Sequence, residues 1–539
     1  MTMAETDFII VGAGSAGCVL AARLSEDTGS SVTLIEAGGS DKHPMISMPL
    51  AWMQALTIEK FGWGMMTEPE PYMDGRVQPL PRGRVMGGSG SINGLMYIRG
   101  AAADYDGWRA QGLEGWGYED VLPYFRRSES NWRGASHLHG GDGPISVVPM
   151  KPHEELFPAF IDTAKNLGYP VASDFNVPAP DGFGLPDVMV LKGVRHSSAR
   201  AFIDPIRGRR NLSVMSGTLV HRILFDGRKA IGVEYEQGGQ RKTLKARREV
   251  ILCAGAFNSP HLLMLSGIGP AAHLADVGIT PLLDLPGVGQ NLQDHPVGMT
   301  FWDAARHNTF ENDLRLDRLA WNVLKWKLTG RGSPAQSPLS VQSFLRSRPD
   351  LARPDIQFQV SHVSYAARPW FPGWRKGAGH VISAGAILLN PASRGRVSLA
   401  SSQPQVIPKV LLNLLQAESD RRTMRDMVIF MRQFFATAPI SDFVTSETAP
   451  GPGAASGDAI DAWLRASVIS GAHPVGTCAM GTGSQAVVDA RLSVHGMESL
   501  RVVDCAVMPD IPRGNTAAPA MMIAEKAADM ILGKPPLPR

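Results

Sequence analysis

Near its start the chain reads Phe8-Ile9-Ile10-Val11-Gly12-Ala13-Gly14-Ser15-Ala16-Gly17. The four apolar residues are typical of a buried parallel strand, and good helix formers follow the glycines. Glycines spaced as Gly-x-Gly-x-x-Gly between a strand and a helix form a dinucleotide-binding turn. Gly12 permits the tight turn, Gly14 lets a pyrophosphate approach the backbone, and Gly17 lets helix and strand pack closely. This stretch therefore predicts a Rossmann-type site, in which the helix N-terminus at Ser15 faces the phosphates.

A carboxylate supports this interpretation. The next apolar strand, Val32–Ile35, ends at Glu36, about twenty residues after the glycines, where an acid can bind ribose hydroxyls. The same charge should repel a 2′-phosphate, which argues against NADP. The fingerprint does not separate NAD from FAD, so both stay open at this point.

Composition excludes several classes of protein. The 53 basic and 50 acidic residues leave a formal charge of +3 with no long single-sign block, so nucleic acid is not an expected partner. No metal-binding spacing occurs, and no apolar run is long enough to span a membrane. We expect a cytoplasmic protein without a signal peptide, and leave peripheral attachment to a membrane open. Free buried thiols of a reducing compartment are expected at Cys18, Cys253, Cys478 and Cys505.

Two kinds of segment alternate along the chain. Apolar strand signals recur at Val250–Leu252 and Leu500–Asp504, and a helical pattern runs from Ala520 to Leu532. We predict an α/β fold in which residues 1–155, 200–300 and 470–539 form a discontinuous FAD-binding domain with a parallel sheet. Residues 156–199 and 301–469 should form an α+β substrate-binding domain on a mainly antiparallel sheet with helices.

Glycine-rich motifs elsewhere identify a family. The stretches 83–94 (Gly-Arg-Val-Met-Gly-Gly-Ser-Gly-Ser-Ile-Asn-Gly) and 255–269 resemble the two signatures of the glucose–methanol–choline (GMC) family of FAD-dependent oxidoreductases. Segments 286–295, 473–478 and 514–516 are similar to further family motifs. The matches extend over nearly the whole chain and look closest to bacterial choline-dehydrogenase-like alcohol dehydrogenases.

The resemblance, together with the nucleotide turn, implies a set of FAD-binding residues. Asp504 should bond the ribityl or pyrophosphate region, and Val220 should contact adenine through its backbone. Some members tether the flavin through a histidine at the position of Ile92, so non-covalent FAD is predicted here. The full set is Gly12, Gly14, Ser15, Ala16, Gly17, Glu36, Ala37, Arg84, Gly88, Ser89, Asn93, Gly94, Leu95, Met96, Val220, Ala254, Ala472, Asp504, Cys505, Asn515 and Thr516.

Two residues are predicted to be catalytic. A histidine titrates near neutrality, which suits removal of a hydroxyl proton while hydride leaves for flavin N5. In the family context His473 takes this role, with Pro474 helping to fix its direction. Asn515 should donate a hydrogen bond to the substrate oxygen. We expect structural roles for His261 and His295.

The predicted reaction is oxidation of an alcohol to an aldehyde or ketone. Its electrons would pass to a quinone-like acceptor or an artificial dye, or to O2 if the protein is an oxidase. A family lyase, of the hydroxynitrile lyase or photodecarboxylase type, and a non-catalytic flavoprotein are the other interpretations. Many members carry an aromatic residue where Ala472 stands, so a bulky alcohol is favoured. The tryptophans that could line an entrance or pack in the core are Trp302, Trp321, Trp326, Trp370 and Trp374.

Overall fold

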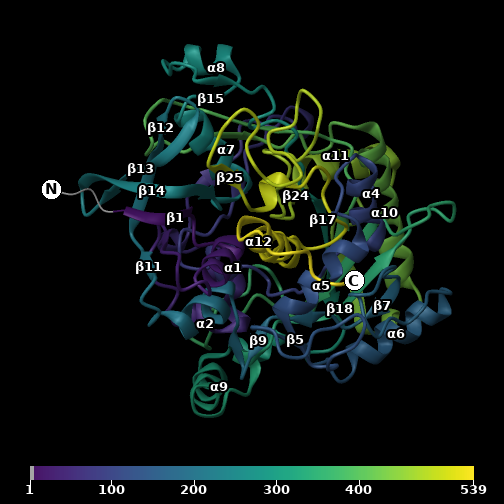
Figure 1. Ribbon diagram of the computed structural model, residues 1–539. Coiled ribbons are helices and arrows are strands. Elements are labelled where there is room, and N and C mark those ends of the chain that lie inside the picture. The colour runs from purple at the N-terminus through teal and green to yellow at the C-terminus, as the bar shows by residue number, and fades with distance from the viewer. Residues whose placement is uncertain (1–4) are drawn as a thin grey trace.

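The computed structural model describes residues 5–539 and contains two large sheets (Figure 1). In the first sheet the parallel strands run in the order β11-β2-β1-β14, and β25 pairs with the last residues of β14. A hairpin, β12 and β13, adds antiparallel pairs to the first half of β14. The bounds are β1 Glu5–Val11, β2 Val32–Ile35, β11 Leu212–Met215, β12 Thr218–Asp226, β13 Lys229–Gln237, β14 Gln240–Leu252 and β25 Leu500–Val502.

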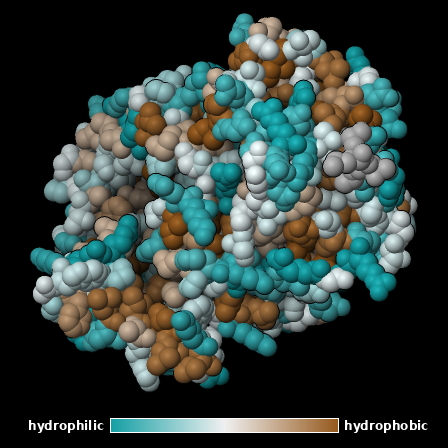
Figure 2. All heavy atoms as spheres, turned by 90° about the vertical axis from the view of Figure 1, so that its left-hand side faces the viewer, coloured by the Kyte–Doolittle hydropathy of each residue, from teal (hydrophilic) through white to brown (hydrophobic). Residues whose placement is uncertain are grey.

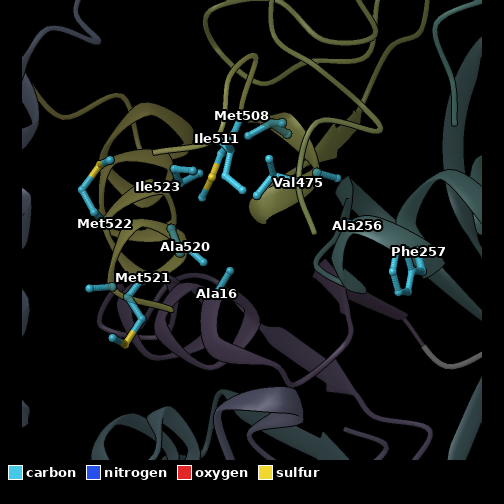
Figure 3. Close-up of a cluster of buried hydrophobic side chains, with 14 of the residues drawn as sticks. Ala16, Ala256, Phe257, Val475, Met508, Ile511, Ala520, Met521, Met522 and Ile523 are labelled. Atoms are coloured by element: carbon cyan, nitrogen blue, oxygen red, sulfur yellow. The ribbon is translucent and has the colours of Figure 1, made fainter. Parts of the chain in front are cut away.

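The C-terminal helix closes this part of the molecule. Helix α12 (Ala517–Ile531) lies along α1 (Ser15–Leu24) and α5 (Tyr118–Ser128), and Figure 3 shows Ala16 of α1 close to α12. The fully buried carboxylate of Glu525 bonds Arg23 of α1 at 2.8 Å and Arg127 of α5 at 2.6 Å. Because both partners are arginines, the three helices are held by a charge-assisted network. The predicted Rossmann-type sheet and its closing C-terminal helix are confirmed.

The second sheet is antiparallel throughout. Its order is β23-β17-β20-β19-β18-β7, and β24 pairs with the start of β17. Helix α10 (Glu418–Ala436) packs on it, with the ring of Phe435 stacked 3.9 Å from that of Trp302. The strands are β7 Gly182–Gly184, β17 Pro296–Ala304, β18 Leu339–Leu345, β19 Ile356–Ser361, β20 Val381–Leu388, β23 Val444–Ala449 and β24 Ile469–Ser470.

One helix contains an internal proline, and another begins earlier than the sequence indicates. Helix α7 runs over Gly255–Leu265, and the carboxylate of Asp504 accepts from the Gly255 N–H at 2.8 Å in its first turn. Pro260 has no N–H for the Ala256 carbonyl, which instead accepts from the Thr477 hydroxyl at 2.6 Å. Helix α12 begins three residues before the predicted Ala520, at Ala517. Where the two domains divide stays a prediction.

One helix stands apart from both sheets. Helix α9 (Leu316–Thr329) lies at the lower edge in Figure 1, the level at which hydrophobic residues gather in Figure 2. Its Trp321 side chain is 67% exposed, whereas Trp326 is buried and donates to the carbonyl of Gly193. Within residues 5–539, no helix is both long enough and apolar enough to cross a membrane.

Candidate active site

A cavity of about 1160 Å³ extends from the nucleotide turn to the second sheet. Its lining brings His473 and Asn515 together with most of the predicted FAD-binding set. From that set it includes Gly12, Gly14, Ser15, Ala16, Glu36, Ala37, Arg84, Gly88, Ser89, Asn93, Gly94, Met96, Val220, Ala254, Ala472, Asp504, Cys505 and Thr516. Gly17 and Leu95 do not line the cavity.

The nucleotide end of the cavity is made of backbone. Gly12 has φ 103°, and a Cβ on Gly17 would lie 1.9 Å from the Gly12 carbonyl oxygen, so the turn and α1 touch without a side chain between them. A Cβ on Gly88 would lie 2.8 Å from Cα of Gly14, so the second glycine-rich loop packs directly on the first. A Cβ on Gly94 would meet no protein atom within 4 Å. These three features leave the open, side-chain-free surface that a flat ring and a pyrophosphate need. We call residues 12–17 and 88–94 the nucleotide wall.

Two buried carboxylates fix the backbone at the nucleotide end of the cavity. Glu36 accepts from the N–H groups of Ala13 and Gly38 at 2.9 and 2.8 Å, and burial raises the pKa of Glu36 to about 7. Its position at the end of β2 suits ribose hydroxyls. Asp504, whose pKa burial also raises, accepts from the Ser259 hydroxyl at 2.6 Å and so ties the end of β25 to α7. The residues present therefore fit the adenosine and pyrophosphate of FAD.

His473 is held through both of its ring nitrogens. Its Nε2 lies 2.9 Å from Nδ2 of Asn515, and its Nδ1 lies 3.0 Å from Nδ1 of His295. Its backbone N–H donates to a buried carboxylate oxygen of Asp294 at 2.8 Å, and that oxygen also accepts from the His295 N–H. The ring is therefore fixed at the junction of the two sheets.

The loop before His473 is fixed as well. Ala472 has φ 61°, a left-handed value that is uncommon outside glycine. Its N–H donates to the Ser470 hydroxyl at 2.9 Å, and its carbonyl accepts from Nη2 of Arg82 at 2.7 Å. Because both backbone groups are bound, this conformation presents the histidine ring in one orientation.

The electrostatics keep His473 neutral. Burial, together with the positive charge of Arg82, lowers the pKa of His473 to about 3. Burial lowers the pKa of His295 as well. Asn515 Oδ1 accepts from Gln357 Nε2 at 3.4 Å, which turns the amide Nδ2 toward His473. Since that amide donates, Nε2 of His473 carries the lone pair and Nδ1 carries the proton toward His295.

The far end of the cavity is formed by side chains from the second sheet. They come from β17, β18, β19 and β20 and share one face, because they alternate with residues of the other face. This surface, the sheet wall, consists of Val297, Met299, Leu339, Gln359, Ser361, Gly385 and Ile387. No motif marks these positions, so the sequence analysis missed them, together with Gln357. Only the strand pattern of β19 and β20 was available as a signal.

The other residues considered from sequence fall outside the reacting pair. His261 lines the cavity from α7, and burial lowers its pKa to about 4. His295, expected to be structural, contacts the proposed base directly. None of the five tryptophans considered for an entrance lines the cavity. Within residues 5–539 that role falls to Trp52 and Trp63.

A Rossmann-type nucleotide wall that faces a neutral histidine–asparagine pair defines a dinucleotide-dependent oxidoreductase. Family models described as GMC oxidoreductase match residues 6–297 and 391–524. The chain belongs to the GMC oxidoreductase family.

Relatives and solved structures agree with this assignment. The oxygen-dependent choline dehydrogenase of Vibrio vulnificus is 42% identical over 99% of this chain and 95% of its own, and that of Brucella canis is 40% identical over 99% and 97%. Pyridoxine 4-oxidase from Mesorbium loti superposes with a TM-score of 0.87 at 30% identity over 98% of this chain and 100% of its own. An Aspergillus oryzae formate oxidase variant gives 0.92 at 27% over 99% of both. The protein is an FAD-dependent alcohol oxidoreductase.

Proposed function

We propose that His473 Nε2 takes the hydroxyl proton of the alcohol while Asn515 Nδ2 donates a hydrogen bond to the same oxygen. The observation that carries this proposal is the pair itself: a neutral imidazole nitrogen and an amide donor 2.9 Å apart at the wall of the cavity. FAD, when bound, supplies the acceptor for the hydride. The base is already deprotonated, and the amide beside it turns its N–H from Nε2 to the developing alkoxide when the alcohol enters between them.

His295 is a positioning residue in this proposal. A proton arriving at Nε2 makes His473 cationic, and its Nδ1–H already points at His295 Nδ1, 3.0 Å away. The neutral His295 accepts this bond and so stabilises the charged ring. Asp294 accepts hydrogen bonds from the backbone N–H groups of both residues and so fixes their relative position.

We also propose that FAD is bound without a covalent tether by the lining residues named above, across the predicted FAD-binding domain. Ile92 is 1% exposed and packs in an apolar cluster with Val85 and Phe61, and its aliphatic side chain has no group to bond a flavin. Acid precipitation should leave the yellow colour in the supernatant. Flavin that stays with the pellet would contradict this part of the proposal.

The proposed function also includes the domain division and the electron acceptor that were predicted from the sequence. Strands of the first sheet all come from residues 1–155, 200–300 and 470–539, which supports the division, although β17 and β24 of the second sheet cross the bounds at 300 and 470 by a few residues. A dehydrogenase passing electrons to a quinone-like acceptor and an oxidase using O2 both fit the site. Formation of H2O2 in air during turnover would favour the oxidase, and turnover only with a quinone analogue would favour the dehydrogenase.

The test is anaerobic reduction of the bound flavin by an alcohol. Replacing His473 with Ala should leave FAD bound and slow reduction at least about a hundredfold, the usual scale of general-base catalysis. The control is His273→Ala, because His273 accepts a hydrogen bond from Leu399 N–H outside the cavity and should not affect the rate. Reduction at the parental rate in His473→Ala would remove this residue from the mechanism, and a colour unchanged during product formation would favour a lyase.

A further inference from the structure

The sheet wall continues without a break to the reacting pair. Met299 of β17 lies opposite Gly385 of β20, which in turn lies opposite Gln359 of β19. A Cβ on Gly385 would come within 2.9 Å of Met299 Sδ, so the methionine lies over this glycine. Two residues before Gln359 on the same face, Gln357 bonds Asn515. The body of an alcohol whose hydroxyl meets His473 therefore rests on this wall.

The wall is uncharged and mostly apolar. Four of its side chains are aliphatic or thioether groups, from Val297, Met299, Leu339 and Ile387. Gln359 contributes a neutral amide, whose Nε2 already donates to Gln342 at 3.2 Å. Such a surface gains roughly 25 cal/mol for each Å² of apolar substrate that it buries.

The charged side chains that line this end of the cavity are arginines, whereas the buried carboxyl of Asp294 lies behind the base and does not line the cavity. Arg82 holds the carbonyl of Ala472, one residue before the base, and its charge reaches His473. Arg368, an exposed residue, lines the cavity from the segment after β19. A cationic substrate would be repelled by both groups.

The carboxylates of the cavity lie elsewhere. In the described part of the chain, residues 5–539, those that line it are Glu36, Glu236 and Asp504. Two of them stand at the ends of β2 and β25 and already accept backbone and hydroxyl hydrogen bonds, and Glu236 belongs to β13. All three therefore belong to the first sheet, at the nucleotide end.

Arginines also cover two of the four Trp, Tyr and Phe side chains that line the cavity in the described part of the chain, the other two being Trp52 and Tyr365. The guanidinium of Arg84 lies 4.9 Å from the ring centre of Trp63, and that of Arg82 lies 6.0 Å from the ring centre of Phe257. Both rings line the cavity. A quaternary ammonium group has no N–H and depends on free aromatic faces or carboxylates, so these two rings do not provide a cage for it.

On the basis of the proposed function, we infer that this protein selects an uncharged alcohol with an apolar body over a quaternary-ammonium alcohol such as choline. The apolar sheet wall receives the body of the substrate, and Arg82 and Arg368 exclude the cation. The charge of the pocket thus departs from what the names of its choline dehydrogenase relatives would lead one to expect.

The sharpest test compares choline with 3,3-dimethylbutan-1-ol, which has the same shape but carbon in place of the charged nitrogen. Dissociation constants are measured in the FAD-loaded His473→Ala protein from changes in the flavin spectrum, so that binding is observed whether or not oxidation occurs. The neutral alcohol should bind at least about tenfold more tightly, a difference of about 1.4 kcal/mol. Equal or tighter binding of choline would overturn the inference.

Two matched variants then test whether the sheet wall is the surface that selects the substrate. Met299→Glu adds a carboxylate there, and Met299→Gln has the same shape without the charge. In the His473→Ala background, the Glu variant should bind choline at least about fivefold more tightly than the Gln variant does, because opposite charges attract strongly in a partly buried site. No difference between the two would contradict the assignment to this wall.

Reduction of the parental flavin separates this inference from the proposed function. If the neutral alcohol binds preferentially and also reduces the flavin faster than choline does, both the inference and the proposed function hold. If it binds preferentially and neither alcohol nor any longer aliphatic alcohol reduces the flavin, the inference holds and the proposed function fails. If choline reduces the flavin faster and binds more tightly, the function holds and the inference fails.

Discussion

The nucleotide wall of the cavity comes from two short stretches of backbone, residues 12–17 and 88–94, whereas the sheet wall comes from single side chains on four strands. In the first, glycines let one loop press on the other, as Gly88 does on Gly14. In the second, Met299 and Gln359 lie on either side of Gly385, on strands that are far apart in the chain. A surface of backbone binds what FAD-dependent proteins share, and a surface of side chains can be changed one residue at a time to select a substrate.

Among the substitutions considered, Gly17→Ala should have the largest effect, because it disrupts the backbone contact that shapes the nucleotide wall. A Cβ in Gly17→Ala would lie 1.9 Å from the Gly12 carbonyl oxygen, so α1 must move away from β1 and the turn loses its shape. We expect purified protein without bound FAD and with a lowered Tm, measured by flavin absorbance and thermal unfolding.

The control is a glycine in a helix outside the cavity. Gly107 lies in α4 (Ala102–Ala110), and a Cβ there would meet no atom within 4 Å. Gly107→Ala should keep both the flavin and the Tm. A Gly17→Ala protein that binds FAD like the parent would show that close backbone contact is not what shapes the nucleotide wall.

The same contrast explains what could be predicted from the sequence. The first strand, turn and helix are contiguous, so spacing alone located Gly12, Glu36 and the sheet that holds them. The fold followed from the family motifs and from strand signals such as Val250–Leu252, which matches the end of β14.

The contacts around the base could not be predicted in that way. His295 and His473 are 178 residues apart, and only the packing of the loop after β24 against the start of β17 brings their rings together. Gln357 sits in an ordinary strand pattern, and its link to Asn515 depends on the register of β19. The sheet wall has no local signature because each strand supplies only one or two of its residues.

A smaller effect is expected from Gln357→Met, which tests whether the second sheet orients Asn515. Gln357→Met keeps the size of the side chain but removes the N–H that donates to Asn515 Oδ1, so the amide is free to turn its oxygen toward His473. We expect the limiting rate of flavin reduction to fall about tenfold, the scale of one hydrogen bond, while FAD and alcohol dissociation constants stay unchanged.

The neighbouring amide provides the control for this prediction. Gln359 donates to Gln342 and has no bond to Asn515, so Gln359→Met should change alcohol binding more than the limiting rate. If Gln357→Met alters only the affinity for the alcohol, Gln357 belongs to the substrate surface and does not orient Asn515.

The smallest expected effect is a pH profile that stays level where an ordinary histidine would titrate. With a pKa of about 3, His473 is neutral throughout pH 5.5–8, so the reduction rate of the FAD-saturated protein should change less than about twofold. An unperturbed histidine, with a pKa of about 6.5, would lose about tenfold between pH 7.5 and 5.5. Arg82→Gln removes a positive charge beside the ring and should move the acidic limb to higher pH, since the protonated form is then less disfavoured. A parental limb centred near 6.5 would contradict the neutral base, because desolvation and Arg82 would then not lower the pKa of His473 in the holoenzyme.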